Sequence, residues 1–148
     1  MPRVSPLALV RVAAAAMLVI HGVSRIRWGG VSPFGEFLTQ NRLPLGHAVA
    51  WAVTAVEIAG GLTLASGRLV RPLCAWFVIQ LLAGVALVHG REGWFVVGLG
   101  RNGVEYSVLL IVCLLAVAWG EPGRAVTTSR DEGLRLPEEP PADARRRT

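Results

Sequence analysis

The chain has 148 residues, of which 53% are hydrophobic and 17% are charged, and its formal net charge is +5 at pH 7. An average soluble domain carries about 25% charged residues, so this composition excludes an ordinary water-soluble domain and favours a protein that lies in lipid. All 15 basic residues are arginines, and they are spread through connecting segments and a charge-balanced tail, which excludes nucleic acid as a partner.

The first of four apolar blocks runs from about residue 7 to residue 26 and contains Arg11, His21 and Arg25. Its length suits a membrane span, because about 20 helical residues cross ~30 Å of hydrocarbon. A cleaved signal peptide is the alternative. Arg11 argues against it, since the core of a signal peptide rarely carries a charge, and the apolar pattern continues to Ile20. We therefore expect a retained helix.

Three further apolar blocks are long enough to cross a bilayer, and each ends in turn-forming residues. The segment after them has too little apolar surface to fold, so we expect it to be a disordered polar tail. The sequence thus predicts an all-α, integral membrane four-helix bundle. Its domain covers residues 1–126, with helices at about 7–26, 45–65, 69–88 and 104–119, followed by the tail at 127–148.

The connections between the predicted helices indicate an orientation. With four spans, both termini share one side of the membrane with the turn between the second and third helices. That side carries a modest excess of arginine, so both termini are expected in the cytoplasm. The loop before the fourth helix is apolar at its centre, where Trp94 and Phe95 are expected to lie at the membrane interface.

Glu57 is the polar residue least expected in this setting. It lies twelve residues after Leu45, or about 18 Å along the second predicted helix. A carboxylate at such depth costs about 2.5–3.5 kcal/mol on insertion scales, so Glu57 should face protein. Gly60 and Gly61 predict close helix packing on its side.

The charge state of Glu57 depends on its neighbours. Arg11 and Arg25 lie nearer the two ends of the first helix. We therefore expect no cation beside Glu57, and a largely neutral carboxyl group at pH 7. A purely structural, hydrogen-bonded Glu57 is the alternative. In the inner half, Gln80 of the third predicted helix is the only polar side chain in the middle of a helix.

Several polar side chains are expected at the outer side, which predicts a polar cavity between the first, second and fourth helices. His89 and Glu105 could instead be interfacial helix ends, with Glu105 stabilising a helix N-terminus. Two His and two Glu suit zinc or iron, but no ExxH or HxxxH pair occurs, so we predict no metal site. Cys74 and Cys113 lie in separate apolar blocks and predict no disulfide. The candidate ligand-binding residues are His21, Arg25, Glu57, His89, Asn102, Glu105 and Tyr106.

Five short motifs occur in order along the predicted helices: His21-Gly22 with Arg25, Glu57-x-x-Gly60-Gly61, His89-Gly90, Asn102-x-x-Glu105-Tyr106, and Gly120-Glu121-Pro122-Gly123-Arg124. Over about residues 7–126 the chain resembles the DoxX family of small bacterial membrane proteins. It departs from the family at Arg25, where Lys is common, and at the last motif, where Gly-Pro-Gly is common. The resemblance carries over no catalytic residue.

The resemblance implies a four-helix bundle in the inner membrane of a bacterial cell. It also implies a link to membrane oxidoreduction, because the family takes its name from a subunit of a thiosulfate–quinone oxidoreductase. It suggests an accessory subunit more than a stand-alone enzyme, a membrane or peripheral oxidoreductase as partner, and a quinone-like ligand. In that reading His21 and Glu105 contact the ligand, Glu57 closes the cavity floor, and Trp94 and Phe95 cover it. Two other classes stay open: a small-molecule transporter that uses Glu57 as a protonatable switch, and a non-catalytic membrane scaffold.

Overall fold

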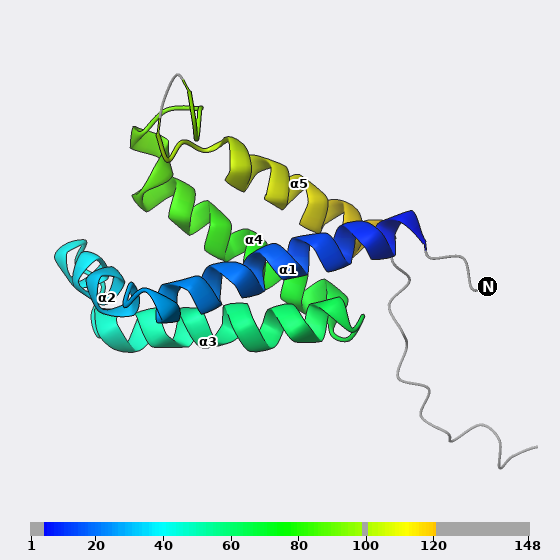
Figure 1. Ribbon diagram of the computed structural model, residues 1–148, viewed down its shortest axis with the longest axis horizontal. Helices are drawn as coiled ribbons and strands as arrows, with labels where there is room; N and C mark the ends of the chain where they lie inside the picture. Colours follow the sequence, from blue (N-terminus) through cyan, green and yellow to red (C-terminus); the bar gives the residue numbers. More distant parts are fainter. Residues whose placement is uncertain (1–4, 99–100, 121–148) are drawn as a thin grey trace, which may run out of the picture.

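The computed structural model describes residues 5–98 and 101–120. Within these residues all regular structure is helical and no strand is present, which confirms the predicted all-α fold (Figure 1). The predicted tail at 127–148 lies outside the described residues, as does most of the motif that begins at Gly120. The helices are α1 (Pro6–Arg27), α2 (Val31–Gln40), α3 (Gly46–Ala65), α4 (Val70–Leu87), a short 3-10 helix (His89–Arg91) and α5 (Glu105–Gly120).

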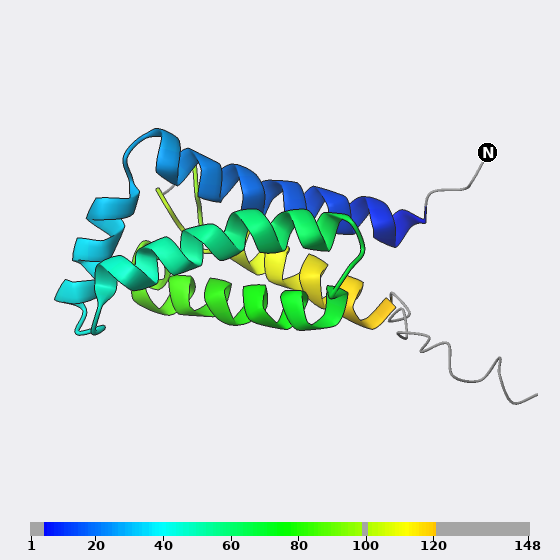
Figure 2. The ribbon, with the colours of Figure 1, turned by 90° about the horizontal axis from the view of Figure 1, so that it is seen from below.

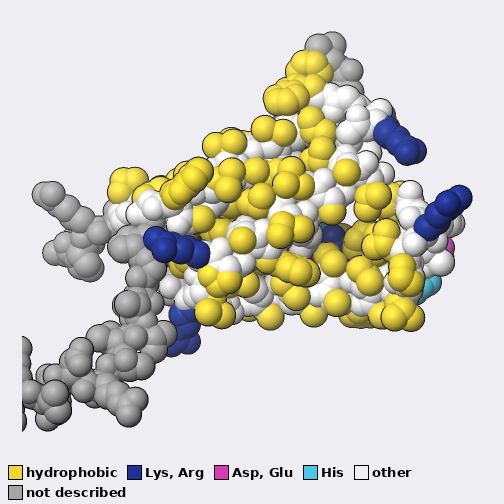
Figure 3. Space-filling view, turned by 180° about the vertical axis from the view of Figure 1, so that it is seen from behind, with side chains coloured by type: hydrophobic (Ala, Val, Ile, Leu, Met, Phe, Trp, Pro, Cys, Tyr) yellow, Lys and Arg dark blue, Asp and Glu magenta, His cyan; other side chains and the backbone are white. Residues whose placement is uncertain are grey.

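Three of the described helices, α1, α3 and α4, are long and apolar enough to cross a membrane. Helix α5 is equally apolar but has 16 described residues, or about 24 Å at 1.5 Å per residue. Hydrocarbon side chains cover much of the face shown in Figure 3. Large side chains such as Leu9, Ile79 and Trp119 are exposed on the molecule, which would be costly in water and is ordinary in lipid.

The four long helices form two pairs. Helix α3 packs along α1, and α4 packs along α5, while α1 also contacts α5 and α3 contacts α4 less extensively. The pairs meet at the end where the first and last described residues lie, and they separate toward the opposite end (Figure 1). The bundle is therefore a wedge that is closed at one end and open at the other.

The closed end of the wedge contains the hydrophobic core. Leu64 of α3, Phe77 of α4, and Leu114 and Val117 of α5 are fully buried there. Helix α1 approaches α3 closely because Gly61 has no side chain, and a Cβ added at Gly61 would lie 2.7 Å from a methyl group of Val19. Small residues at such contacts let helices in lipid pack without a hydrophobic driving force.

Helix α2 lies where the sequence predicted only a loop, and it crosses the open end beside α1 and α3 (Figure 2). Val31, Phe34 and Leu38 recur at helical spacing and turn one face toward α3. Proline often marks a turn, but Pro33 stands in the first turn of α2, where its missing N–H breaks no intrahelical hydrogen bond.

The loop between α4 and α5 is held by paired backbone groups. The N–H of Gly103 donates to the carbonyl of Phe95 at 3.1 Å, and the N–H of Glu105 donates to the carbonyl of Trp94 at 3.0 Å. A Cβ on Gly103 would lie 2.5 Å from the Trp94 oxygen, so this crossing requires glycine. The loop thus has a defined position over the open end of the wedge.

Candidate functional site

A cavity of about 620 Å³ occupies the open part of the wedge, between the α1–α3 pair and the α4–α5 pair. Figure 3 shows the recess from behind, with a basic side chain inside it. Its wall is mostly hydrocarbon, contributed by every described α-helix, and not by the three predicted helices alone. The apolar lining includes Leu18, Phe34, Val53, Trp76, Ile79, Leu81, Leu87 and Leu110, and the polar lining is His21, Arg25, Glu57, Gln80, His89, Asn102, Tyr106 and Ser107.

An ion pair between Arg25 and Glu57 lies at the polar end of this cavity. Nη1 of Arg25 is 2.7 Å from Oε2 of Glu57, and Nη2 is 3.4 Å from Oε1. The two side chains are 13% and 3% exposed, so neither charge is hydrated as it would be in water. The prediction that Glu57 has no cationic partner is therefore wrong, and the expectation of a neutral carboxyl group loses the premise on which it rested.

Gly22 explains how Arg25 reaches Glu57. A Cβ added at Gly22 would lie 3.1 Å from the Cβ of Glu57, so these two residues are at the same depth. Arg25 lies less than one turn beyond Gly22, and side chains on a helix point toward its N-terminus. The long side chain of Arg25 thus folds back along α1 to the level of the carboxylate.

Arg25 has two further partners besides Glu57. Its Nη1 donates to the Thr54 hydroxyl at 2.9 Å, and this hydroxyl in turn donates to the carbonyl of Ala50 at 2.7 Å. The Phe34 ring of α2 lies 4.7 Å from the guanidinium carbon, which is within the range of a cation–π contact. The guanidinium therefore joins α1, α2 and α3 at one point.

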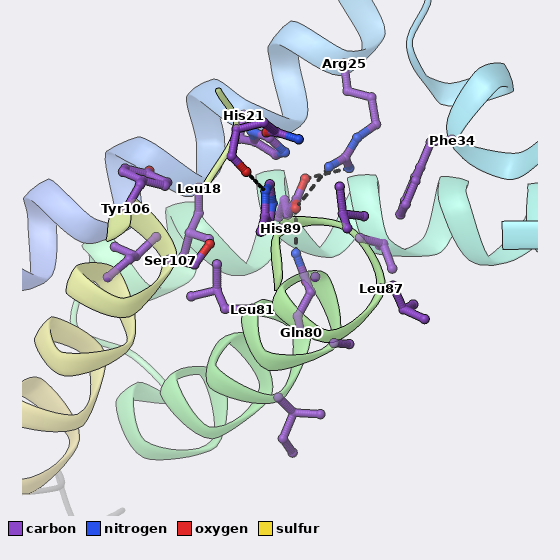
Figure 4. Close-up of a pocket in the computed structure, with 18 of the residues that line it drawn as sticks. Leu18, His21, Arg25, Phe34, Gln80, Leu81, Leu87, His89, Tyr106 and Ser107 are labelled. Atoms are coloured by element: carbon purple, nitrogen blue, oxygen red, sulfur yellow. Dashed lines mark hydrogen bonds and ion pairs between the residues drawn. The ribbon is translucent and has the colours of Figure 1, made fainter. Parts of the chain in front are cut away.

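Gln80 brings α4 into the same cluster. Its Nε2 donates to Oε1 of Glu57 at 2.5 Å, and Figure 4 shows Gln80 and Arg25 reaching the carboxylate from opposite sides. The sequence analysis had placed Gln80 alone in the inner half of the membrane. Glu57 stands nine residues before Ser66 and Gln80 eleven residues after Leu69, so the α3–α4 hairpin brings them to similar depth. That spacing in the sequence indicates that Gln80 and Glu57 lie at the same depth.

The cavity that holds the ion pair is also lined by His21, His89 and Tyr106 (Figure 4). Nδ1 of His89 lies 2.8 Å from the carbonyl oxygen of Asn102, which connects the end of α4 to the loop. Ser107 also lines the cavity and is 4% exposed, although the sequence analysis did not select it. Within residues 5–98 and 101–120, no three His, Cys, Asp or Glu side chains converge as a metal site would require.

Glu105 is the one candidate ligand-binding residue that does not line the cavity. Its Oε1 accepts the backbone N–H of Val96 at 2.9 Å. Trp94 and Phe95 are 54% and 42% exposed and do not line it either, contrary to the expectation that they cover it. The loop contributes Val96, Asn102 and Gly103 to the cavity wall, and Glu105 holds this loop in place.

The ion pair, its polar neighbours and a hydrocarbon wall thus lie together inside a bundle of apolar helices, which defines a multi-pass membrane protein. The DoxX family model matches residues 7–91, more than half of the chain, and the chain belongs to the DoxX family. This match ends at Arg91, so the likeness noted around Asn102 and Gly120 lies beyond it. No curated protein and no solved structure matches the chain.

Proposed function

We propose that the chain is an accessory subunit of a membrane redox system that holds a quinone-like, amphipathic molecule in its cavity. The observation that carries the proposal is the composition of the cavity. Its wall is hydrocarbon, while Arg25, Glu57 and Gln80 form a polar cluster on one side. Sites for small molecules commonly combine a mostly apolar wall with a few placed polar groups.

The size of the cavity suits such a ligand. Pockets of about 300–1,000 Å³ bury most of a drug-sized molecule, and this one measures about 620 Å³. Leu18, Leu81 and Leu110 offer apolar surface to a ring, and the imidazole of His21 and the phenol of Tyr106 offer groups that donate or accept hydrogen bonds. These two side chains are the ones we expect to contact the ligand's head group and to exchange protons with it.

In this proposal the ion pair supports the site and does not take part in proton exchange. In it Glu57 closes the cavity floor, and Arg25 and Gln80 hydrogen-bond to its two oxygens. A transporter that uses Glu57 as a protonatable switch would have to neutralise a carboxylate whose partner cation is 2.7 Å away. That would leave Arg25 buried without a counter-charge, which weakens the transporter hypothesis.

The proposal also includes the side of the membrane on which the cavity lies and the kind of partner. With both termini in the cytoplasm of the bacterial inner membrane, α2 and the α4–α5 loop face outward, and the cavity lies in the outer half of the bilayer. The partner is a membrane or peripheral oxidoreductase that exchanges electrons with the held molecule.

Trp76 provides a direct test of ligand binding. It lines the cavity, and a bound quinone quenches the fluorescence of a neighbouring tryptophan, so titration of the purified protein with a short-chain benzoquinone should give saturable quenching. Trp76→Phe should lose most of this signal, whereas Trp119→Phe should keep it, since Trp119 does not line the cavity. Quenching that does not saturate, or that is unchanged in Trp76→Phe, would contradict the proposal.

A further inference from the structure

We infer that the molecule held in the cavity has a long hydrocarbon tail, and that this tail leaves the cavity sideways, between α3 and α4, into the bilayer. The inference rests on the proposed function and makes it more specific, because it fixes the chemistry of the tail and the side from which the molecule enters. It depends on a lateral gap in the cavity wall, called the α3–α4 opening below, which is bordered by Val53, Trp76, Ile79 and Ala83.

Helices α3 and α4 touch near the turn that joins them and separate further along. A Cβ added at Gly60 would lie 3.1 Å from Cζ of Phe77, so the hairpin is closed at that level. Val53 stands twelve residues before the end of α3 and Ala83 thirteen residues after the start of α4, so both lie at similar depth, nearer the open end of the wedge. Both line the cavity, which therefore separates the two helices there.

The α3–α4 opening is visible from outside the bundle. Helix α1 passes in front of α4 in Figure 1, and these two helices lie at opposite edges of the bundle in Figure 2. The view from behind in Figure 3 therefore faces α4, and it shows a recess with hydrocarbon side chains around it and a basic side chain inside it. Among the described residues, Arg25 is the one arginine that lines the cavity. The recess thus leads from the outer surface to the polar cluster.

The rim of the opening consists of hydrocarbon and aromatic side chains. Trp76, Ile79 and Ala83 follow one another at spacings of three and four residues, so they lie along one side of α4. All three line the cavity and are exposed, Trp76 to 46% and Ile79 to 63%. Val53 borders the opening from α3. A hydrocarbon chain can lie across this rim without leaving a polar group unpaired, whereas a polar chain would lose its hydrogen bonds there.

The depth of the opening also favours a hydrocarbon tail. Ile79 lies nine residues after Val70 and eight before Leu87, in the middle of a helix long and apolar enough to cross a membrane. The opening therefore faces the hydrocarbon of the bilayer and not water. A cavity of about 620 Å³ encloses a drug-sized head group, so a tail that reaches across a leaflet, ~15 Å, must lie outside it.

The test is titration of the protein in lipid nanodiscs with two benzoquinones, one with a methyl substituent and one with a decyl tail. The saturable part of the Trp76 quenching is the readout, and affinities are expressed per mole fraction of benzoquinone in the lipid. The wild-type protein should bind both within about threefold, because the tail stays in hydrocarbon whether or not the head group is bound. Ala83→Phe places a ring at the rim, and it should weaken decyl binding at least about tenfold more than methyl binding.

Ala75→Phe is the matched control, because Ala75 is exposed on the same helix and does not line the cavity. It should leave the ratio of the two affinities as in the wild type. Val53→Phe narrows the opening from α3 and should act as Ala83→Phe does, so it decides if Ala83→Phe does not fold.

Two results would overturn the inference while leaving the proposed function intact. One is binding of the methyl compound but not the decyl compound by the wild-type protein, since a lipid chain or a second copy of this chain would then cover the opening. The other is an unchanged ratio of the two affinities in the variants that narrow the opening. Binding of neither compound by the wild-type protein would overturn the proposed function as well.

Discussion

Gly22 of α1 faces Glu57 of α3 so closely that a Cβ atom at Gly22 would lie 3.1 Å from the Cβ of Glu57 and 2.9 Å from Cγ1 of Ile58. This contact sets the depth at which Arg25, further along the same helix, meets the carboxylate. The ion pair, and with it the polar end of the cavity, therefore depends on the absence of a side chain at residue 22.

Gly22→Ala should destabilise the bundle by about 1–3 kcal/mol, since the added methyl group pushes α1 away from α3. Gly84→Ala is the matched control, because a Cβ there meets only Cδ2 of His89, at 3.8 Å. Alanine is the better helix former, so the control should be neutral or up to about 1 kcal/mol more stable. Unfolding in mixed micelles, followed by circular dichroism, measures both. Equal stability of the two variants would contradict the close contact.

Removing both partners of the Arg25–Glu57 pair should lower the stability by less than the sum of the two single losses. Arg25→Leu and Glu57→Leu each leave one buried charge unpaired, and each should lose about 3–5 kcal/mol. The double variant leaves none, so its loss should fall short of the sum of the two by at least about 1 kcal/mol. Arg27→Leu, at an exposed position of α1, should change stability by less than about 0.5 kcal/mol. Additive losses would show that the two side chains do not interact.

Glu105 should tolerate an amide but not a hydrocarbon side chain. Its Oε1 accepts the N–H of Val96, and the amide oxygen of glutamine can accept the same bond. Glu105→Gln should thus keep wild-type stability and benzoquinone affinity, whereas Glu105→Leu should loosen the loop and lose about 1–3 kcal/mol. If Glu105→Gln abolished ligand binding while the protein stayed folded, Glu105 would contact the ligand, as the sequence analysis first suggested.

The orientation of the bundle can be measured with single cysteines in a Cys74→Ala and Cys113→Ala background. Arg68, in the turn between α3 and α4, is expected in the cytoplasm, and Arg42, after α2, is expected on the outer side. In intact cells a membrane-impermeant maleimide should label Arg42→Cys and leave Arg68→Cys unmodified until the membrane is opened. The reverse labelling pattern would invert the proposed topology.

Hydropathy and turn residues were enough to predict the long helices, because lipid requires long apolar helices that satisfy their own backbone groups. Helix α2 was missed because Gly29, Gly30 and Pro33 together are typical of a turn, while its apolar spacing is supported by contacts with α3 that a local pattern does not reveal. Hydropathy alone also could not show that Glu105 holds the loop before α5 by accepting the backbone N–H of Val96.

The polar residues near the open end could be grouped by depth, but their partners could not be assigned. Arg25 was judged too close to the interface because depth was measured at the backbone, whereas its side chain folds back by about one turn. Gln80 was assigned to the wrong half because its depth was not compared with that of Glu57 across the turn. Long polar side chains and the offset between helices decide which groups meet.

The central claim, that the cavity holds a ligand, is tested most directly by filling the cavity without disturbing the fold. Gly84→Leu adds a side chain where a Cβ has room, and Ala86→Leu adds hydrocarbon at an exposed position of α4 that does not line the cavity. Calorimetric titration with a short-chain benzoquinone should show binding to the wild-type protein and to Ala86→Leu. Gly84→Leu, with unfolding stability equal to or above wild type, should bind at least about tenfold more weakly. Equal affinity of Gly84→Leu and the wild-type protein would contradict the claim that this cavity is the binding site.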